Sequence, residues 1–213
     1  MEPKIKIDIV SDVVCPWCIV GYKRLEKAIV EMGIQDRVEI EWQPFELNPQ
    51  MPPEGENVNE HISRKYGTTQ EDNRRSKEQL SKLGAEVDFK FDYFEDMKMP
   101  NTLDAHILID YARENGKQTE LNVRLVEAYF SERKDISKRE ILLQELNSIG
   151  LDKQEALKRL DDADARLKLK EKEAYWKNKG IRSVPTMLFN GANVITGAHP
   201  LHVYKQVLTG LLK

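Results

Sequence analysis

The chain has 213 residues, of which 36 are acidic and 33 basic, so its formal net charge is −3. Charges of both signs are mixed along the sequence, which argues against nucleic acid as a partner because no basic field is available to neutralise phosphates. No apolar run approaches the roughly 18 residues of a membrane-spanning helix, so we expect a soluble protein with no membrane partner. Hydrophobic residues, at 40%, suffice for a core, and the length favours one domain with a large insertion.

The start of the chain bears on its cellular compartment. Residues 1–6 lead directly into a strand-like alternation and lack the apolar stretch and small-residue cleavage site of a secretory signal. The sequence therefore predicts a cytoplasmic protein. A chain from which a signal had been removed would have the same start.

The first part of the sequence predicts a strand, a helix and a second strand. Isoleucines alternate with polar residues over residues 5–10, and a similar alternation follows over 37–42. Between them, apolar side chains recur every three or four residues from Cys18 to Met32, which is typical of an amphipathic helix, and Gly33 ends it. This order is a βαβ unit, in which the two strands are parallel.

The middle of the chain predicts helices. Prolines break regular structure over residues 44–55. Helical patterns follow, with Asn101 or Thr102 as the cap of one helix and capping boxes that start at Ser137 and Asp152. Besides the helices after these boxes, the predicted helices lie at residues 68–82, 103–111 and 121–130.

The last part of the chain returns to strands. Short strands are predicted at residues 185–189 and 194–196 around the turn signal Asn190-Gly191, and a helix over 200–208. Strands at both ends with helices between them predict an α/β fold.

The boundaries of this arrangement follow from where the composition changes. The sheet is expected to begin in residues 1–50 and to be completed, after one more helix, in residues 166–213. Residues 51–165 are then a helical insertion into one connection.

The two cysteines lie in the segment Cys15-Pro16-Trp17-Cys18, at the predicted start of the first helix. A loop this short constrains little of the unfolded chain, so the value of the pair is chemical. A thiol attacks a disulfide as a thiolate, and the positive end of a helix stabilises negative sulfur. Pro16 suits the first helical position, where its missing N–H costs nothing. We therefore expect Cys15 to be the attacking thiolate and Cys18 the resolving thiol.

A pair of cysteines two residues apart can also be half of a zinc site. His199 and His202 are the candidates for the other half. Their spacing is shorter than the three to five intervening residues that zinc fingers use, and such a site does not need a hydrophobic strand before the cysteines. Redox chemistry is favoured and no metal is expected, while a non-enzymatic zinc or partner-binding module stays an alternative.

Several motifs follow one another along the chain: SDVVCPWC at residues 11–18, PFELNP at 44–49, PNTLDAH at 100–106, and Val184-Pro185 followed by Gly197-Ala198. Together they resemble the DsbA-like thioredoxin-fold family, most closely its FrnE-like branch of cytosolic proteins, over nearly the whole chain. The resemblance implies a thioredoxin-like fold with a large helical insertion. It also implies a cis Val184–Pro185 bond that faces the cysteines and offers its backbone to substrate, so both residues are expected to contact substrate.

Two positions depart from related families. Many thioredoxins have a buried acid six residues before the first cysteine, as a proton acceptor for the resolving thiol; here that position is Ile9, with Asp8 and Asp12 nearby. The related kappa-class glutathione transferases and 2-hydroxychromene-2-carboxylate isomerases usually have serine for the first cysteine, and a Ser-Asp pair that grips glutathione. Here Cys15 and Ala198-His199 stand in these places, which favours dithiol exchange over the alternative of a glutathione-dependent transferase or isomerase.

Four side chains beside the cysteines and in the insertion are further candidates for substrate binding. Pro16 and Trp17 are expected to contact substrate, because a large apolar group beside a nucleophile usually serves binding. Asn101 and His106 lie near the start of an inserted helix that caps the active site in the resembling fold. A structural interpretation is open for both, with Asn101 as a helix cap and His106 as a satisfied or exposed histidine.

The predicted function is thiol-disulfide exchange by an oxidoreductase or isomerase, with disulfide- or thiol-containing proteins or small molecules as partners. The reaction needs no cofactor besides the Cys15–Cys18 disulfide, and glutathione is one reductant that could regenerate the dithiol. Neither the direction of exchange nor the oligomeric state follows from the sequence, because sites with the same four-residue frame span roughly −270 to −120 mV.

Overall fold

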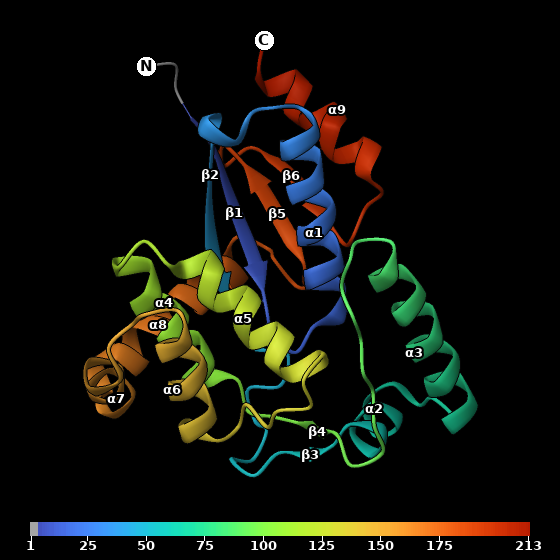
Figure 1. Ribbon diagram of the computed structural model, residues 1–213, viewed down its shortest axis with the longest axis vertical. Helices are drawn as coiled ribbons and strands as arrows, with labels where there is room; N and C mark the ends of the chain where they lie inside the picture. The colour runs from blue at the N-terminus through green and yellow to red at the C-terminus, as the bar shows by residue number, and fades with distance from the viewer. Residues whose placement is uncertain (1–3) are drawn as a thin grey trace.

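A computed structural model describes residues 4–213 and contains a four-stranded sheet in the order β2-β1-β5-β6 (Figure 1). The central pairing joins the two ends of the chain, since β1 is antiparallel to β5; on the outer sides β1 is parallel to β2, and β5 is antiparallel to β6. The predicted βαβ unit and its parallel strands are therefore confirmed. The strands are β1 (Ile5–Ser11), β2 (Val38–Pro44), β5 (Thr186–Phe189) and β6 (Asn193–Thr196).

The hairpin between β5 and β6 turns at the predicted dipeptide. Asn190 and Gly191 both have positive φ, 50° and 69°. They are the two central residues of a turn that is closed by a 3.2 Å hydrogen bond from the Ala192 N–H to the Phe189 carbonyl, and three residues separate the paired Phe189 and Asn193. Asparagine and glycine tolerate this left-handed backbone best. The local sequence thus determines the register in which β6 joins the sheet.

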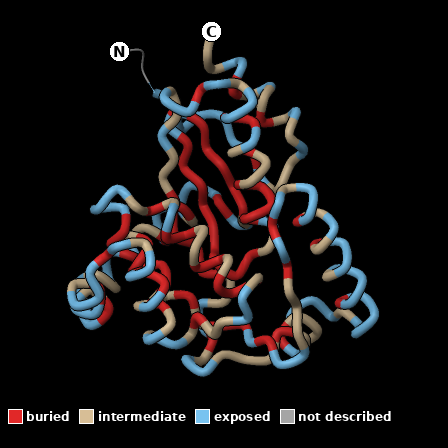
Figure 2. Tube along the Cα trace, in the orientation of Figure 1, coloured by how far each residue is buried: buried red, intermediate tan, exposed pale blue. Residues whose placement is uncertain are grey.

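One face of the sheet packs against α1 (Pro16–Glu31) and α9 (Leu201–Leu211). Ile7 and Ile9 of β1 are fully buried in one cluster with Leu25 of α1 and with Tyr204 and Leu208 of α9. These positions alternate along the strand and recur at helical spacing, so the sequence pattern places all of them in the core. Figure 2 shows the resulting band of buried strands.

The other face of the sheet is also covered. Val10 of β1 and Leu188 of β5 pack with Trp176 of α8 (Ala163–Asn178) and with Ile181. The alternation in β1 predicts one buried face; the structure buries both because α8 crosses behind the strands. Val184, in the loop before β5, packs against this second layer.

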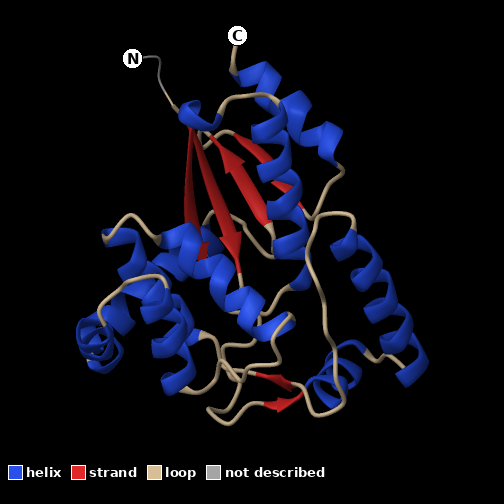
Figure 3. Cartoon of the chain, viewed as in Figure 1, coloured by secondary structure: helices blue, strands red, loops and turns tan. Residues whose placement is uncertain are grey.

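The remaining helices lie between β2 and β5 in the chain and gather at one end of the sheet (Figure 3). A two-stranded ribbon, β3 (Glu56–Asn57) with β4 (Lys98–Met99), and the short 3-10 turn η1 (Gln35–Arg37) complete the secondary structure described for residues 4–213. The helices are α2 (Val58–Tyr66), α3 (Gln70–Ala85), α4 (Leu103–Glu114), α5 (Gln118–Phe130), α6 (Arg139–Ser148) and α7 (Lys153–Asp161).

Of the two capping boxes predicted in this region, one starts a helix and the other does not. Asp152 caps α7 as expected, since its carboxylate accepts from the backbone N–H groups two and three residues later. The capping box predicted at Ser137 is wrong: its hydroxyl donates to Asp135 instead, and α6 begins two residues later at Arg139. Serine side chains often hydrogen-bond within turns instead of capping a helix, and here both the hydroxyl and the N–H of Ser137 donate to the Asp135 carboxylate. The short helix α2 was not predicted.

Candidate active site

The dithiol segment lies where β1 ends and α1 begins (Figure 1). Cys15 is the N-cap of α1, with an extended backbone (φ −90°, ψ 110°), and Pro16 is the first helical residue. Proline is preorganised for this position by its fixed φ. Cys15 therefore sits at the positive end of the helix dipole, an environment that favours an anion.

The two cysteines differ in what surrounds them more than in how far they are exposed. Both are free, they approach each other to 3.2 Å, and they are 4% and 2% exposed. Cys18 faces the core, next to the Ser11 hydroxyl and the Asp12 backbone; burial, followed by the proximity of Cys15, raises the pKa of its thiol well above the ordinary value. This environment favours the protonated form of Cys18.

The loop before β5 faces the cysteines. The Val184–Pro185 peptide bond is cis, as the resemblance implies, and Cys15 Sγ lies 3.8 Å from the carbonyl oxygen of Val184. The Pro185 carbonyl accepts a hydrogen bond from the Gly197 N–H at 2.8 Å. Gly21 of α1 lies beside this loop, since a β-carbon there would be in ordinary van der Waals contact with Pro185 Cγ at 3.4 Å.

Trp17 is set apart from the other tryptophans by its exposure. It is 39% exposed, whereas Trp42 and Trp176 are 4% and 6% exposed. The buried pair contribute to packing, and both indole N–H groups donate hydrogen bonds within the protein. Trp17, which lies between the two cysteines in sequence, presents an apolar surface to solvent, and its contact with substrate stays a prediction.

A buried pair of ionisable groups lies directly behind the dithiol segment. His106 of α4 places Nε2 3.3 Å from Asp12 Oδ1, and both side chains are buried. Neither atom has a hydrogen-bond partner that meets the geometric criteria, and the contact is an ion pair when His106 is protonated. Burial by itself lowers the pKa of His106, but Asp12, with smaller contributions from Glu46 and Glu173, raises it above the ordinary value of 6.5.

Asp12 also fixes the loop that follows β2. Its Oδ2 accepts a hydrogen bond from the Leu47 N–H at 2.8 Å. The next residue back, Glu46, is buried and donates its backbone N–H to Glu173 of α8 at 2.7 Å, and Lys170 forms an ion pair with both carboxylates. Burial raises the pKa of Glu46 despite the opposing effect of Lys170.

Of the two acids near Ile9, only Asp12 lies at the dithiol segment. Asp8 points to the opposite face of β1, where its carboxylate accepts from Gln43 Nε2 at 2.7 Å. Gln43 in turn accepts from Trp176 Nε1 at 3.2 Å, which ties Asp8 to the layer formed by α8. Successive residues of a strand point to opposite faces, so Asp8 cannot replace a carboxylate at Ile9.

Asn101 and His106 do not occupy equivalent places. Asn101 Oδ1 accepts from the Leu103 N–H at 3.0 Å, and its Nδ2 donates to the Met51 carbonyl at 2.8 Å. Both halves of its amide are thus used, which favours a structural role at the start of α4, although the N-cap itself is Thr102, whose side chain makes no capping hydrogen bond. His106 is buried against Asp12, which favours the interpretation as a paired core histidine.

Sequence reasoning missed three residues of this region. Glu46 lies inside one of the quoted motifs, but its partner Glu173 is 127 residues away and sits in an ordinary polar helix pattern. Tyr93, in the segment between α3 and β4, has a buried hydroxyl with no hydrogen-bond partner among the residues that the structure describes. Burial, with a further contribution from Cys15, raises the pKa of Tyr93. Nothing in the sequence around Tyr93 signals this location.

The four-ligand zinc arrangement is not assembled in residues 4–213. Across this part of the chain no three histidine, cysteine, aspartate or glutamate side chains converge as a metal site requires. His199 Nε2 instead lies 3.0 Å from the Thr196 carbonyl oxygen, and His202 is exposed on α9.

Residues 6–209 match the family model described as a DSBA-like thioredoxin domain. The chain belongs to the DsbA-like thioredoxin-domain family. A curated relative, the uncharacterized protein YwbO of Bacillus subtilis, is 31% identical over 208 residues and covers 96% of both chains. The expected family and fold, a thioredoxin-like sheet with inserted helices, are therefore confirmed.

Solved structures agree with this DsbA-like assignment. The probable DsbA oxidoreductase of Streptomyces coelicolor superposes with a TM-score of 0.91 at 28% identity, over 98% of this chain and 90% of the other. The cytosolic disulfide reductase DsbM of Pseudomonas aeruginosa, solved with GSH, has a TM-score of 0.65 at 14% identity, over 97% and 98% of the two chains, and shares the fold. Within residues 4–213, none of the helices combines the length and apolar character required to cross a bilayer.

Proposed function

We propose that this DsbA-like protein is a thiol-disulfide oxidoreductase or isomerase that reacts through Cys15 and Cys18. The observation that carries the proposal is the position of Cys15 at the start of α1, with its sulfur 3.8 Å from the Val184 carbonyl oxygen. An extended substrate that pairs with the backbone of this loop would bring its disulfide to Cys15. Membership of the family, whose members are oxidoreductases, supports the same chemistry.

In the reducing direction, the Cys15 thiolate attacks one sulfur of the substrate disulfide. The substrate S–S bond breaks, a mixed disulfide forms at Cys15, and the first substrate thiolate leaves. Cys18 then loses its proton and attacks Cys15 Sγ, which releases the second substrate thiolate and forms the Cys15–Cys18 disulfide. Two electrons have passed from the dithiol to the substrate, and the reverse sequence oxidises a substrate dithiol.

The surroundings of Cys18 suit the second step. Before the reaction, burial and the neighbouring Cys15 keep the pKa of Cys18 high, so its thiol does not compete for substrate. Once Cys15 is held in a mixed disulfide it carries no negative charge, and its contribution to that raised pKa is removed. The Ser11 hydroxyl and the Asp12 backbone, which favour the ionised thiol, then assist its attack.

The proposed substrates are protein or small-molecule disulfides. Val184 and Pro185 would contact the substrate backbone, and the exposed ring of Trp17, next to Pro16, would cover its apolar side chains. We place the activity in the cytoplasm, with glutathione as one reductant that returns the disulfide to the dithiol. No further cofactor takes part.

Two single substitutions test this proposal, because an attacking and a resolving cysteine fail differently. Cys15→Ala is expected to abolish reduction of insulin disulfides and to leave no covalent adduct. Cys18→Ala is expected to accumulate a mixed disulfide through Cys15, visible by mass spectrometry. Equal trapping by the two variants would contradict the assigned roles. Full turnover by Cys18→Ala with glutathione would indicate a transferase that uses one thiol.

A further inference from the structure

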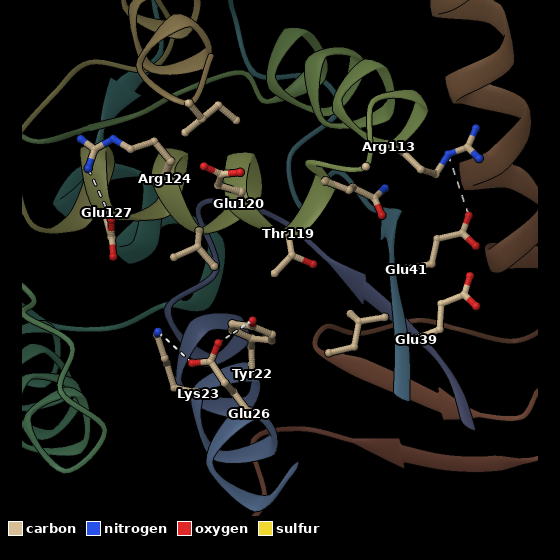
Figure 4. Close-up of a pocket in the computed structure, with 15 residues that line it drawn as sticks. Tyr22, Lys23, Glu26, Glu39, Glu41, Arg113, Thr119, Glu120, Arg124 and Glu127 are labelled. Atoms are coloured by element: carbon tan, nitrogen blue, oxygen red, sulfur yellow. Dashed lines mark hydrogen bonds and ion pairs between the residues drawn. The ribbon is translucent and has the colours of Figure 1, made fainter. Parts of the chain in front are cut away.

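A concavity lies at the edge of the sheet, away from the cysteines. It has a volume of about 850 Å³ and is bounded by α1, β2 and α5 (Figure 4). Tyr22 of α1 lines it, seven residues beyond Cys15 and thus about 10 Å along the helix. The concavity is therefore a separate surface, and its chemistry has to be derived from its own residues.

The backbone of β2 is open on the side that faces this concavity. β2 is an edge strand, and only its inner side pairs with β1. Trp42 turns its N–H and C=O outward, where the side chain of Gln118 binds both at 2.9 Å. Every second residue of a strand directs its backbone to the same edge, so the N–H and C=O of Ile40 also face outward. Gln118 closes one end of this edge and leaves Ile40 open.

The side chains of this edge separate into an apolar and an acidic face. Ile40 lines the concavity together with Tyr22, Val123 and Ile149. The ring of Tyr22 also packs against Trp42, 4.9 Å between centroids, so the even-numbered residues of β2 face α1. Glu39 and Glu41 alternate with these residues along β2, so their side chains point to the face of the sheet opposite α1.

The cations that line the concavity are already neutralised. Lys23 pairs with Glu26 at 2.9 Å, Arg124 pairs with Glu145 at 2.6 Å, and Arg113 pairs with Asp110 at 3.1 Å. Glu39 and Glu120 are exposed lining residues, and neither forms an ion pair within the described residues 4–213. The charge left over at this surface is therefore negative.

We propose that the open edge of β2 binds an extended segment of a partner protein in which apolar and basic residues alternate. The segment would add a fifth strand beside β2 through the backbone of Ile40. Its apolar side chains would contact Ile40, Tyr22 and Val123, and its basic side chains would lie near Glu39. A second copy of this chain, paired edge to edge through β2, is disfavoured because it would place like charges opposite each other.

The test uses a fluorescein-labelled peptide of sequence Lys-Val-Lys-Val-Lys-Val and the full-length protein, with fluorescence anisotropy as the readout. Glu39→Lys should weaken binding about 5- to 10-fold, because an attraction becomes a repulsion. Glu171→Lys, which reverses an exposed acid on α8, is the matched control and should bind like wild type. Ile40→Pro removes the outward N–H and should weaken binding further, with circular dichroism to verify that the variant is folded.

Several results would overturn the proposal. Equal binding of a Glu-Val-Glu-Val-Glu-Val peptide, or equal affinities of the Glu39→Lys and Glu171→Lys variants, would show that the acidic edge does not select the ligand. Peptide-induced NMR shifts confined to residues outside β2, α1 and α5 would place the peptide elsewhere. The Cys15→Ser variant should bind the peptide unchanged, so that failure of the redox proposal and failure of this one are distinguishable.

Discussion

The sheet region and the helical region contribute to the candidate active site in different ways. The sheet region, with β1, the start of α1 and the loop before β5, supplies both sulfurs and the Val184 carbonyl. The helical region supplies charge: His106 comes from α4, and Lys170 and Glu173 come from α8. The first set depends on backbone geometry and the second on ion pairs that exist only after folding.

Asp12 is where the two regions meet. It belongs to the dithiol segment, yet its carboxylate contacts His106 of the inserted helix and the loop after β2. The comparison teaches that the reacting atoms can be held by one region while another determines the electrostatics around them. Substitutions in the helical region should therefore change stability and pH dependence, whereas those near the cysteines should change exchange.

The largest expected effect breaks the link between the regions. His106→Ala leaves the Asp12 carboxylate buried without its cationic partner, and losing one member of a buried pair costs about 3 kcal/mol of folding free energy. Urea unfolding at pH 6 measures it. His202→Ala, at an exposed position of α9, is the control and should change stability by less than about 0.5 kcal/mol. A similar small loss in both variants would show that Asp12 and His106 are not an ion pair.

The pH dependence of stability sharpens the same point. Because the pKa of His106 is raised in the folded state, its proton stabilises the fold fully below the unfolded value of 6.5, and this contribution is lost as pH rises through the folded-state value. The neutral variant His106→Gln lacks this dependence. The free-energy difference between wild type and variant, from urea unfolding between pH 5 and pH 9, should be largest at low pH. A difference that grows with pH would contradict the raised pKa.

A smaller effect is expected at the start of α4. Asn101→Ala removes the acceptor for the Leu103 N–H and the donor to Met51, and loss of such side-chain hydrogen bonds at a helix start costs about 1 kcal/mol. Asn178→Ala, at the exposed end of α8, is the control and should be neutral within about 0.5 kcal/mol. If Asn101→Ala instead loses disulfide exchange with unchanged stability, Asn101 contacts substrate.

The smallest effect on folding and the clearest on substrate binding should come from Trp17. Trp17→Ala removes a 39% exposed ring, so stability should stay nearly constant while KM for a protein disulfide rises about fivefold. Tyr175→Ala, which removes another exposed aromatic, on α8, should leave KM unchanged. An unchanged KM in Trp17→Ala would remove this ring from the proposed substrate surface.

Several elements of the molecule were predictable because their causes are local. The alternation in β1, the periodicity of α1 with Pro16 at its start, and the Asn190-Gly191 turn each depend on neighbours in sequence. The capping box at Ser137 failed for the same reason, since another local contact with Asp135 was equally available. The cis Val184–Pro185 bond was expected from the family resemblance, because proline before a strand is by itself ambiguous.

The sequence by itself determined the dithiol at a helix start, the strands of the main sheet with most of the helices between them, and the family; it did not predict α2 or the β3–β4 ribbon. Only the tertiary structure decided which acid lies behind the dithiol, because Asp8 and Asp12 are both near Ile9 in sequence but lie in different surroundings. It also decided that Asp12 meets His106, and that the backbone of Ile40 stays open beside Gln118. Partners dozens of residues apart are brought together by packing of the whole core, and no local pattern records such a contact.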